Sequence, residues 1–262
     1  MKYLLILLLT ACSVKSSHHE VAILKEEYLL IVAVDAKNFN YSDLGSYLTS
    51  LTLDEHRDVG HAWVALKGHI NGMPVCLMGG HSGEFGQTAP RYLDTFYYLV
   101  KQNDPNPVSA LFKIRQDGVF EEGNGGHKPT FAVAFVLNKE SFQKVLKLLE
   151  RDGYDFASYN LLNHHCVHFA ATCLAVAGFP VEVSSWYELP QRGEIFGIPV
   201  QLWSQKEYSG FELSTPETLE WALRDQVNRR NGVIAFDALE VLTSSNKFPY
   251  TSPKEELSHA SN

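Results

Sequence analysis

The sequence predicts an α+β domain, in which antiparallel strands pack against separate helices. Two short apolar runs rich in strand-forming residues occupy 28–34 and 130–137. Asn71-Gly72 lies between two further apolar segments and is typical of a β-hairpin turn. Clear helical periodicity begins only after 137. The expected order is therefore strand, hairpin, strand and helix, then a strand or loop and further helices.

The first half of the chain supplies the expected hairpin. A strand at 28–34 is followed by hairpin strands at 61–66 and 75–78, the second of which ends in a glycine-rich loop. Residues 101–129 contain several prolines and glycines, so we expect mostly exposed loop there, with one strand at 110–114.

The second half supplies the helices. Asn138 follows the strand at 130–137 and is expected to cap a helix that runs to about Arg151. A second helix carries apolar residues at 3.6-residue spacing and ends at Gly178, a favourable C-terminal cap. The last helix is expected at 214–230, where Ser-Thr-Pro-Glu is a typical start.

Composition limits the class of protein. The 262 residues are 45% hydrophobic with a net charge of −8, and the basic residues form no cluster. We therefore do not expect the protein to bind nucleic acid. We expect one domain at 28–245 and a loose polar tail at 246–262.

The N-terminus has the pattern of an export signal. Lys2 precedes a short apolar run, and Leu-Thr-Ala then leads into Cys12. This stretch looks like a bacterial lipobox, which implies that residues 1–11 are removed and that Cys12 carries lipid. Residues 12–27 would be a tether to the membrane. Because Ser13 is not an aspartate, the resemblance favours the outer membrane, facing the periplasm. An ordinary cleaved signal with a chance cysteine is the alternative.

Three cysteines remain if Cys12 is lipidated. Cys166 and Cys173 are seven residues apart, which on one helix is roughly 10 Å and too far for a disulfide. Cys76 can pair with only one of them, so an exported protein would keep at least one free thiol.

The stretch Asn-His-His-Cys-Val-His-Phe at 163–169 has three interpretations. Cys166 shares an apolar stripe with Phe169 and Cys173, so it can be an inert core residue. A zinc site is disfavoured because neighbouring helical side chains point about 100° apart. As a catalytic thiol, Cys166 would follow the cap Asn163 and gain a lowered pKa from the helix dipole and a nearby imidazolium.

A catalytic thiol needs a histidine from elsewhere in the fold. His61 and His81 are each ten residues from Asn71, so we expect them to lie opposite each other across the hairpin. One would be the base and the other its orienting partner.

These motifs together resemble the circularly permuted papain-like thiol hydrolases, which include permuted NlpC-type peptidases, the lecithin–retinol acyltransferase group and the PPPDE isopeptidases. The match covers roughly 55–180, where a Gly-His strand precedes a Y-x-L-L-x-x-x-C-x-H-F motif. The matching residues of that motif are Tyr159, Leu161, Leu162, Cys166, His168 and Phe169. The sequence departs from the family in the residue just before the cysteine, where His164-His165 intervenes.

The resemblance implies a papain-like sheet packed on a cysteine-bearing helix. Cys166 would be the nucleophile, His61 the base and His81 the third member, with His69 as a rival for the last role. The supporting candidates are Asn163, His165 and His168.

The expected function is that of a lipid-anchored envelope thiol hydrolase or acyltransferase acting on an amide or ester. The favoured substrate is a peptidoglycan peptide, followed by a lipid-like substrate, and neither a metal nor an organic cofactor is needed. The alternative is a binding or scaffold lipoprotein that keeps the fold without the chemistry. A zinc-dependent hydrolase is the third option.

Overall fold

The computed structural model describes residues 22–37, 60–83, 118–150, 152–188, 192–195, 197–201 and 210–244. The expected signal peptide at 1–11, the lipidation site Cys12, the expected strand at 110–114 and the tail at 246–262 lie outside the described residues.

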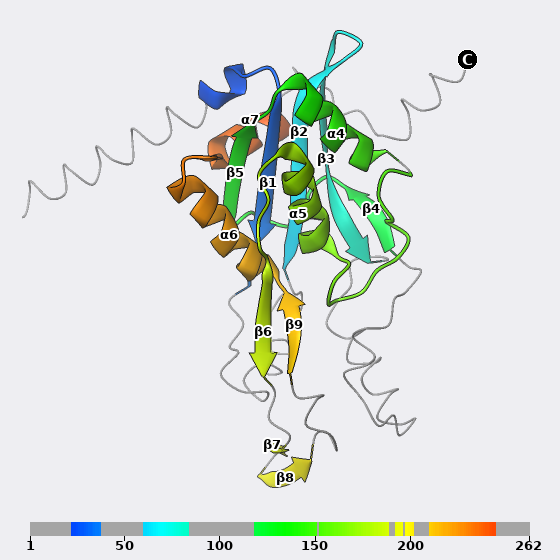
Figure 1. Ribbon diagram of the computed structural model, residues 1–262, viewed down its shortest axis with the longest axis vertical. Helices are drawn as coiled ribbons and strands as arrows, with labels where there is room; N and C mark the ends of the chain where they lie inside the picture. The colour runs from blue at the N-terminus through cyan, green and yellow to red at the C-terminus, as the bar shows by residue number, and fades with distance from the viewer. Residues whose placement is uncertain are drawn as a thin grey trace, which may run out of the picture.

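A six-stranded sheet forms the centre of the domain (Figure 1). Its order is β10-β5-β1-β2-β3-β4, and every neighbouring pair is antiparallel. The strands are β1 (Leu29–Asp35), β2 (His61–Ile70), β3 (Met73–Gly83), β4 (Gly118–Glu122), β5 (Phe131–Val136) and β10 (Val233–Ile234). With the helices described next, this arrangement confirms the α+β class.

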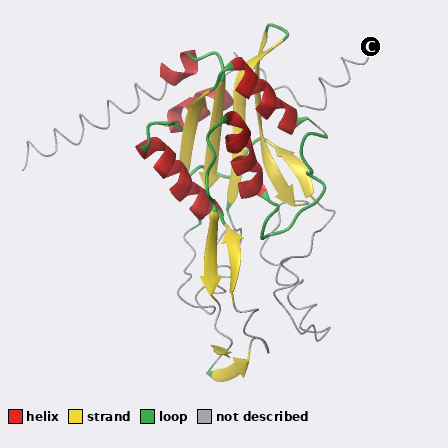
Figure 2. Cartoon of the chain, viewed as in Figure 1, coloured by secondary structure: helices red, strands yellow, loops and turns green. Residues whose placement is uncertain are grey.

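Helices cover both faces of the sheet (Figure 2). One face packs on α4 (Lys139–Leu149), α5 (Cys166–Ala177) and α6 (Pro216–Asn228). The other packs on α7 (Phe236–Ser244) and on the 3₁₀ helix η1 (Ile23–Lys25). Successive strand residues alternate between the faces. Val32 and Ala62 therefore face α5, whereas Trp63 faces away from it. We call these the α5 face and the α7 face.

Three of the expected helix ends are confirmed, at Asn138, Gly178 and Thr215. The Asn138 side chain accepts the Ser141 N–H at 2.8 Å and so caps α4. Gly178 adopts φ 100° and ends α5 in the left-handed conformation. Thr215 and Thr218 exchange hydrogen bonds in a capping box at the start of α6.

Two small ribbons complete the described part. β6 (Ser184–Glu188) pairs with β9 (Gly210–Ser214), and β7 (Arg192–Ile195) pairs with β8 (Ile198–Gln201). The β6–β9 ribbon projects beyond one end of the sheet (Figure 1). None of the helices in the described ranges has the length and apolarity needed to span a bilayer.

The hairpin turn has the expected location, but the expected pairing of two histidines is wrong. Asn71 and Gly72 both have positive φ, 52° and 81°, and form a two-residue turn closed by the pair Ile70↔Met73. This register, extended along the strands, aligns His61 with Ser82 and Ala62 with His81. A shift of one residue moves a side chain to the other face of the sheet. His61 and His81 therefore point to opposite faces.

The loop expected at 101–129 contains a strand. β4 is an edge strand paired with the last residues of β3, from Gly79↔Glu122 to Gly83↔Gly118. Gly79 is required here because a Cβ at that position would lie 2.3 Å from the Phe120 ring. β4 has no continuous apolar run, because an edge strand exposes part of its surface, and the sequence pattern therefore missed it.

Candidate active site

Cys166 is the first residue of α5, and His165, not Asn163, is the N-cap. The His165 Nδ1 accepts the Val167 N–H at 3.4 Å. Asn163 is exposed in the preceding turn, where its own N–H donates to Asn160 Oδ1 at 2.9 Å. Because the Asn160 side chain closes this turn, the helix begins two residues later than an Asn163 cap would set it.

Four polar groups surround the sulfur of Cys166. Its Sγ lies 3.8 Å from His165 Nδ1. The backbone N–H groups of Ala62, Val167 and Cys166 itself also face the sulfur and favour a negative charge on it. Since Nδ1 already accepts the Val167 N–H, the proton between sulfur and imidazole belongs to the thiol, which donates.

The expectation of a lowered thiol pKa is wrong. Burial raises the pKa of Cys166 to about 11, although the three backbone N–H groups oppose this effect. No imidazolium compensates, because burial and then the charge of His168 hold the pKa of His165 well below its usual value. The dipole of a three-turn helix does not outweigh the loss of solvent around a side chain that is 6% exposed.

The sulfur lies where two strands part. The β2–β3 ladder ends at Val64↔Gly79, and β3 then continues on β4 alone. Ala62 is on the α5 face beyond that last pair, and its N–H faces the sulfur. The separation of β2 from β3 therefore leaves the backbone of β2 open to the thiol.

His81 shares the α5 face with Cys166. The rings of Tyr154, Phe156, Tyr159 and His164 meet it edge-on, with centroids 5.1–5.7 Å away. Its Nε2–H donates to the Phe156 carbonyl at 3.1 Å, which fixes the tautomer.

The other ring nitrogen of His81 is open. Nδ1 is buried and finds no hydrogen-bond partner among the described residues. Burial lowers the pKa of His81 to about 4, so the ring is neutral and Nδ1 is an acceptor at neutral pH.

His61 does not approach the thiol from the α5 face. Its ring stacks on Trp63 and His127 on the α7 face, with centroids 6.0 and 5.0 Å away. Burial, then the charge of His127, lowers the pKa of His61 to about 3. The side chains of His61 and His81 therefore leave the sheet on opposite faces, although His61 directly precedes Ala62, whose N–H faces the Cys166 sulfur.

The remaining histidines have distinct places. His168 lies against His165 with ring centroids 4.5 Å apart at 90°. His164 donates from Nε2 to the Asp155 carbonyl at 2.7 Å. His69 is eight residues further along β2 than His61, roughly 26 Å along the strand. It is therefore no rival to His81 near the thiol.

Within the described part of the chain, no three histidine, cysteine, aspartate or glutamate side chains are arranged to hold a metal ion. Cys76, Cys166 and Cys173 are all free thiols. Comparison of the chain with models of protein families, with curated proteins and with solved structures gives no match.

Two polar groups on the α7 face were not expected from the sequence. His127 lies in a glycine-rich stretch and is not among the residues that the sequence singles out, yet its ring contacts both His61 and Asp35. Asp35 ends a fully buried strand, and a charged residue in that position is the sequence signal that points to a buried polar contact. The carbonyl of Phe156, which orients His81, has no sequence signal because it belongs to the main chain.

Proposed function

We propose that the protein is a thiol hydrolase or acyltransferase in which Cys166 attacks the carbonyl carbon of an amide or ester. The observation that carries the proposal is the convergence of three backbone N–H groups and one imidazole nitrogen on the Cys166 sulfur. An inert core thiol needs no such groups, whereas a sulfur that gives up its proton during attack needs a base to take the proton and N–H groups that stabilise the charge left on the sulfur.

The first half-reaction begins from a neutral thiol and a neutral imidazole. As the sulfur bonds to the carbonyl carbon, its proton passes to His165 Nδ1. The negative charge moves to the carbonyl oxygen, where backbone N–H groups at the start of α5 stabilise it. The carbon–nitrogen or carbon–oxygen bond then breaks, and the leaving group takes the proton from His165.

The second half-reaction resolves the thioester. His81 is a neutral acceptor on the same face, with Nε2–H held by a carbonyl and Nδ1 open. In the proposal, Nδ1 takes the proton of the water or acceptor nucleophile that attacks the thioester. The carbon–sulfur bond then breaks, and the proton held by His81 passes to the leaving sulfur and restores the Cys166 thiol. Water gives hydrolysis, and an amine or alcohol gives acyl transfer.

The proposed fold is the permuted papain-like one. It is supported by a cysteine at the start of a helix packed on an antiparallel sheet, with both histidine strands earlier in the chain. His61, the residue that matches the family histidine, instead faces α7. In this chain the proposal therefore rests on His165 and His81.

The proposed substrate follows from the envelope location that the lipobox-like N-terminus implies. A peptidoglycan stem peptide is the first choice and a lipid ester the second, with the protein held at the outer membrane by lipid on Cys12. No nucleic acid or cofactor takes part.

The experiment is an activity screen of the full chain on isolated stem peptides and on phospholipids. Cys166→Ala should abolish product release, while Cys173→Ala should retain it. Cys173 is the matched control, since it is also buried on α5 but lies two turns away. Equal activity in the Cys166→Ala and unmodified chains would overturn the proposal.

A binding or scaffold lipoprotein is the second candidate function. The observation that favours it is the thiol itself, which is 6% exposed and has its pKa raised to about 11. In that case the rings around His81 are only core packing. Loss of the Cys166 thiol would then leave ligand binding and folding unchanged.

A further inference from the structure

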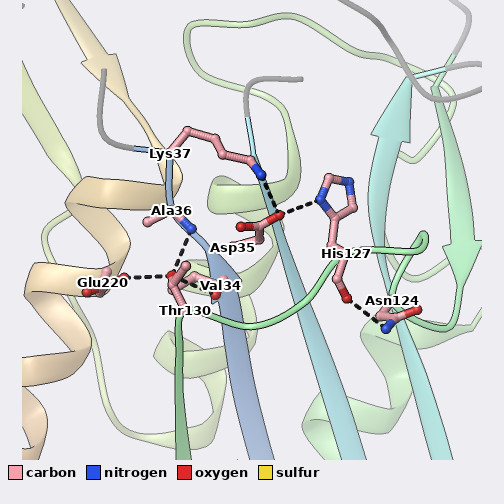
Figure 3. Close-up of polar contacts among 8 residues, drawn as sticks. All are labelled: Val34, Asp35, Ala36, Lys37, Asn124, His127, Thr130 and Glu220. Atoms are coloured by element: carbon pink, nitrogen blue, oxygen red, sulfur yellow. Dashed lines mark hydrogen bonds and ion pairs between the residues drawn. The ribbon is translucent and has the colours of Figure 1, made fainter. Parts of the chain in front are cut away.

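Asp35, which lies on the α7 face, forms a hydrogen-bonded pair with His127 (Figure 3). The Nδ1–H of His127 donates to Asp35 Oδ2 at 2.8 Å. The Lys37 ammonium lies 3.2 Å from the same oxygen. The Asp35 carboxylate is only 9% exposed, so these contacts are made largely out of solvent.

The turn after β4 fixes the position of His127. Its N–H donates to the Asn124 carbonyl at 3.0 Å, and the Asn124 side-chain amide donates back to the His127 carbonyl at 2.8 Å. The Asn124 Oδ1 also accepts the Gly126 N–H at 3.2 Å. These hydrogen bonds within the turn fix the backbone of His127, and so position its imidazole in the absence of a ligand.

The hydrogen bond to Asp35 determines what His127 can do. Because Asp35 holds the Nδ1–H group, Nε2 is the ring nitrogen left to exchange a proton, on a side chain that is 19% exposed. Burial raises the pKa of Asp35, but the His127 hydrogen bond and the Lys37 contacts outweigh it, so the pKa falls below its usual value. An ionised carboxylate behind an oriented imidazole is the arrangement of a general base.

The ring of His61 packs against one side of the Asp35–His127 pair. Its ring stacks on His127 with an interplanar angle of 28°. Its Nε2 is buried and has no hydrogen-bond partner in the described ranges. Gly80 leaves space for that atom, because a Cβ there would lie 2.7 Å from it.

A metal site does not explain this cluster. Lone pairs of imidazoles lie in the ring planes, and two nearly parallel stacked rings do not direct them at one ion. Asp35 is also occupied by His127 and Lys37. We therefore interpret the Asp35–His127 pair as a site of proton transfer.

We propose that Asp35 and His127 form a second acid–base site, separate from Cys166, that activates water for attack on a carboxylic ester. His127 Nε2 takes a proton from water as its oxygen bonds to the carbonyl carbon. The ester carbon–oxygen bond then breaks, and the imidazolium returns the proton to the leaving alkoxide. Asp35 stays ionised throughout and stabilises the imidazolium.

The first test measures the reactivity of the imidazole. The full chain is treated with diethyl pyrocarbonate, and the modification rate of each histidine is measured by peptide mass spectrometry. His127 should react faster than His69, a more exposed histidine on β2. Asp35→Asn should slow His127 by about tenfold or more. Equal rates for His127 and His69, or no effect of Asp35→Asn, would overturn the proposal.

The second test measures hydrolysis of p-nitrophenyl acetate in the Cys166→Ala chain, so that the thiol contributes nothing. Adding His127→Gln should lower the remaining rate by about 10²-fold, whereas adding His69→Gln should leave it unchanged. His127 lies in a turn, so its variant should keep the circular dichroism spectrum even if Asp35→Asn fails to fold. A rate that does not depend on His127 would refute the second site, whatever the role of Cys166.

Discussion

Buried neutral histidines should make the fold unstable in acid. The folded pKa is about 3 for His61 and about 4 for His81, because burial disfavours the charged ring. The unfolded chain has the ordinary value of about 6.5. Since the folded pKa values are depressed, this stability is present above pH 6.5. It is lost as the pH falls towards 4, where the unfolded state binds more protons.

The magnitude follows from the two pKa values. Between pH 8 and pH 4.5, linkage gives a loss of about 2.5 kcal/mol for each of the two histidines. Their sum, about 5 kcal/mol, is comparable to the whole stability of many domains. The slope contributed by each is at most about 1.4 kcal/mol per pH unit.

The assay is urea unfolding of the full chain from pH 8 to pH 4.5. His61→Gln and His81→Gln should each flatten the pH dependence of the unfolding free energy by about one proton. His69→Gln is the matched control for the loss of a histidine, because that side chain is 37% exposed. A slope that His61→Gln and His81→Gln leave intact would refute the neutral, buried state of these rings.

Three further outcomes are expected. Iodoacetamide labelling of Cys166 should have a pH midpoint near 11, and a midpoint below 8.5 would refute the neutral thiol. Gly118→Ala should lower activity with the substrate of Cys166 and destabilise the fold by about 1–3 kcal/mol. The new Cβ would lie 2.1 Å from the Phe156 carbonyl that orients His81. Thr215→Ala should cost about 1 kcal/mol in thermal unfolding by removing the α6 cap, and no change would contradict the capping box.

Local signals predicted much of the fold. Asn138 and Gly178 lie where their capping roles require, and Asn71-Gly72 forms the hairpin turn. Each depends on backbone preferences of a few neighbouring residues. Cys166 also begins a helix as expected, although with a different cap.

The candidate site was less predictable because it depends on register and burial. The predicted pairing of His61 with His81 places the centre of the turn at Asn71, whereas the centre lies between Asn71 and Gly72. This difference of one residue places His61 and His81 on opposite faces of the sheet. The Cys166 pKa depends on solvent exclusion by elements distant in sequence. The pairing of Asp35 with His127 spans 92 residues and follows only from the sheet and the turn after β4.

Intact mass spectrometry of the full chain after brief exposure to an activated acyl ester shows directly whether Cys166 is a nucleophile. We expect one added acyl group, located on Cys166 by peptide mapping, labile to hydroxylamine and absent in Cys166→Ala. An unmodified chain, or an acyl group carried only by Cys76 or Cys173, would contradict the role of Cys166 as nucleophile.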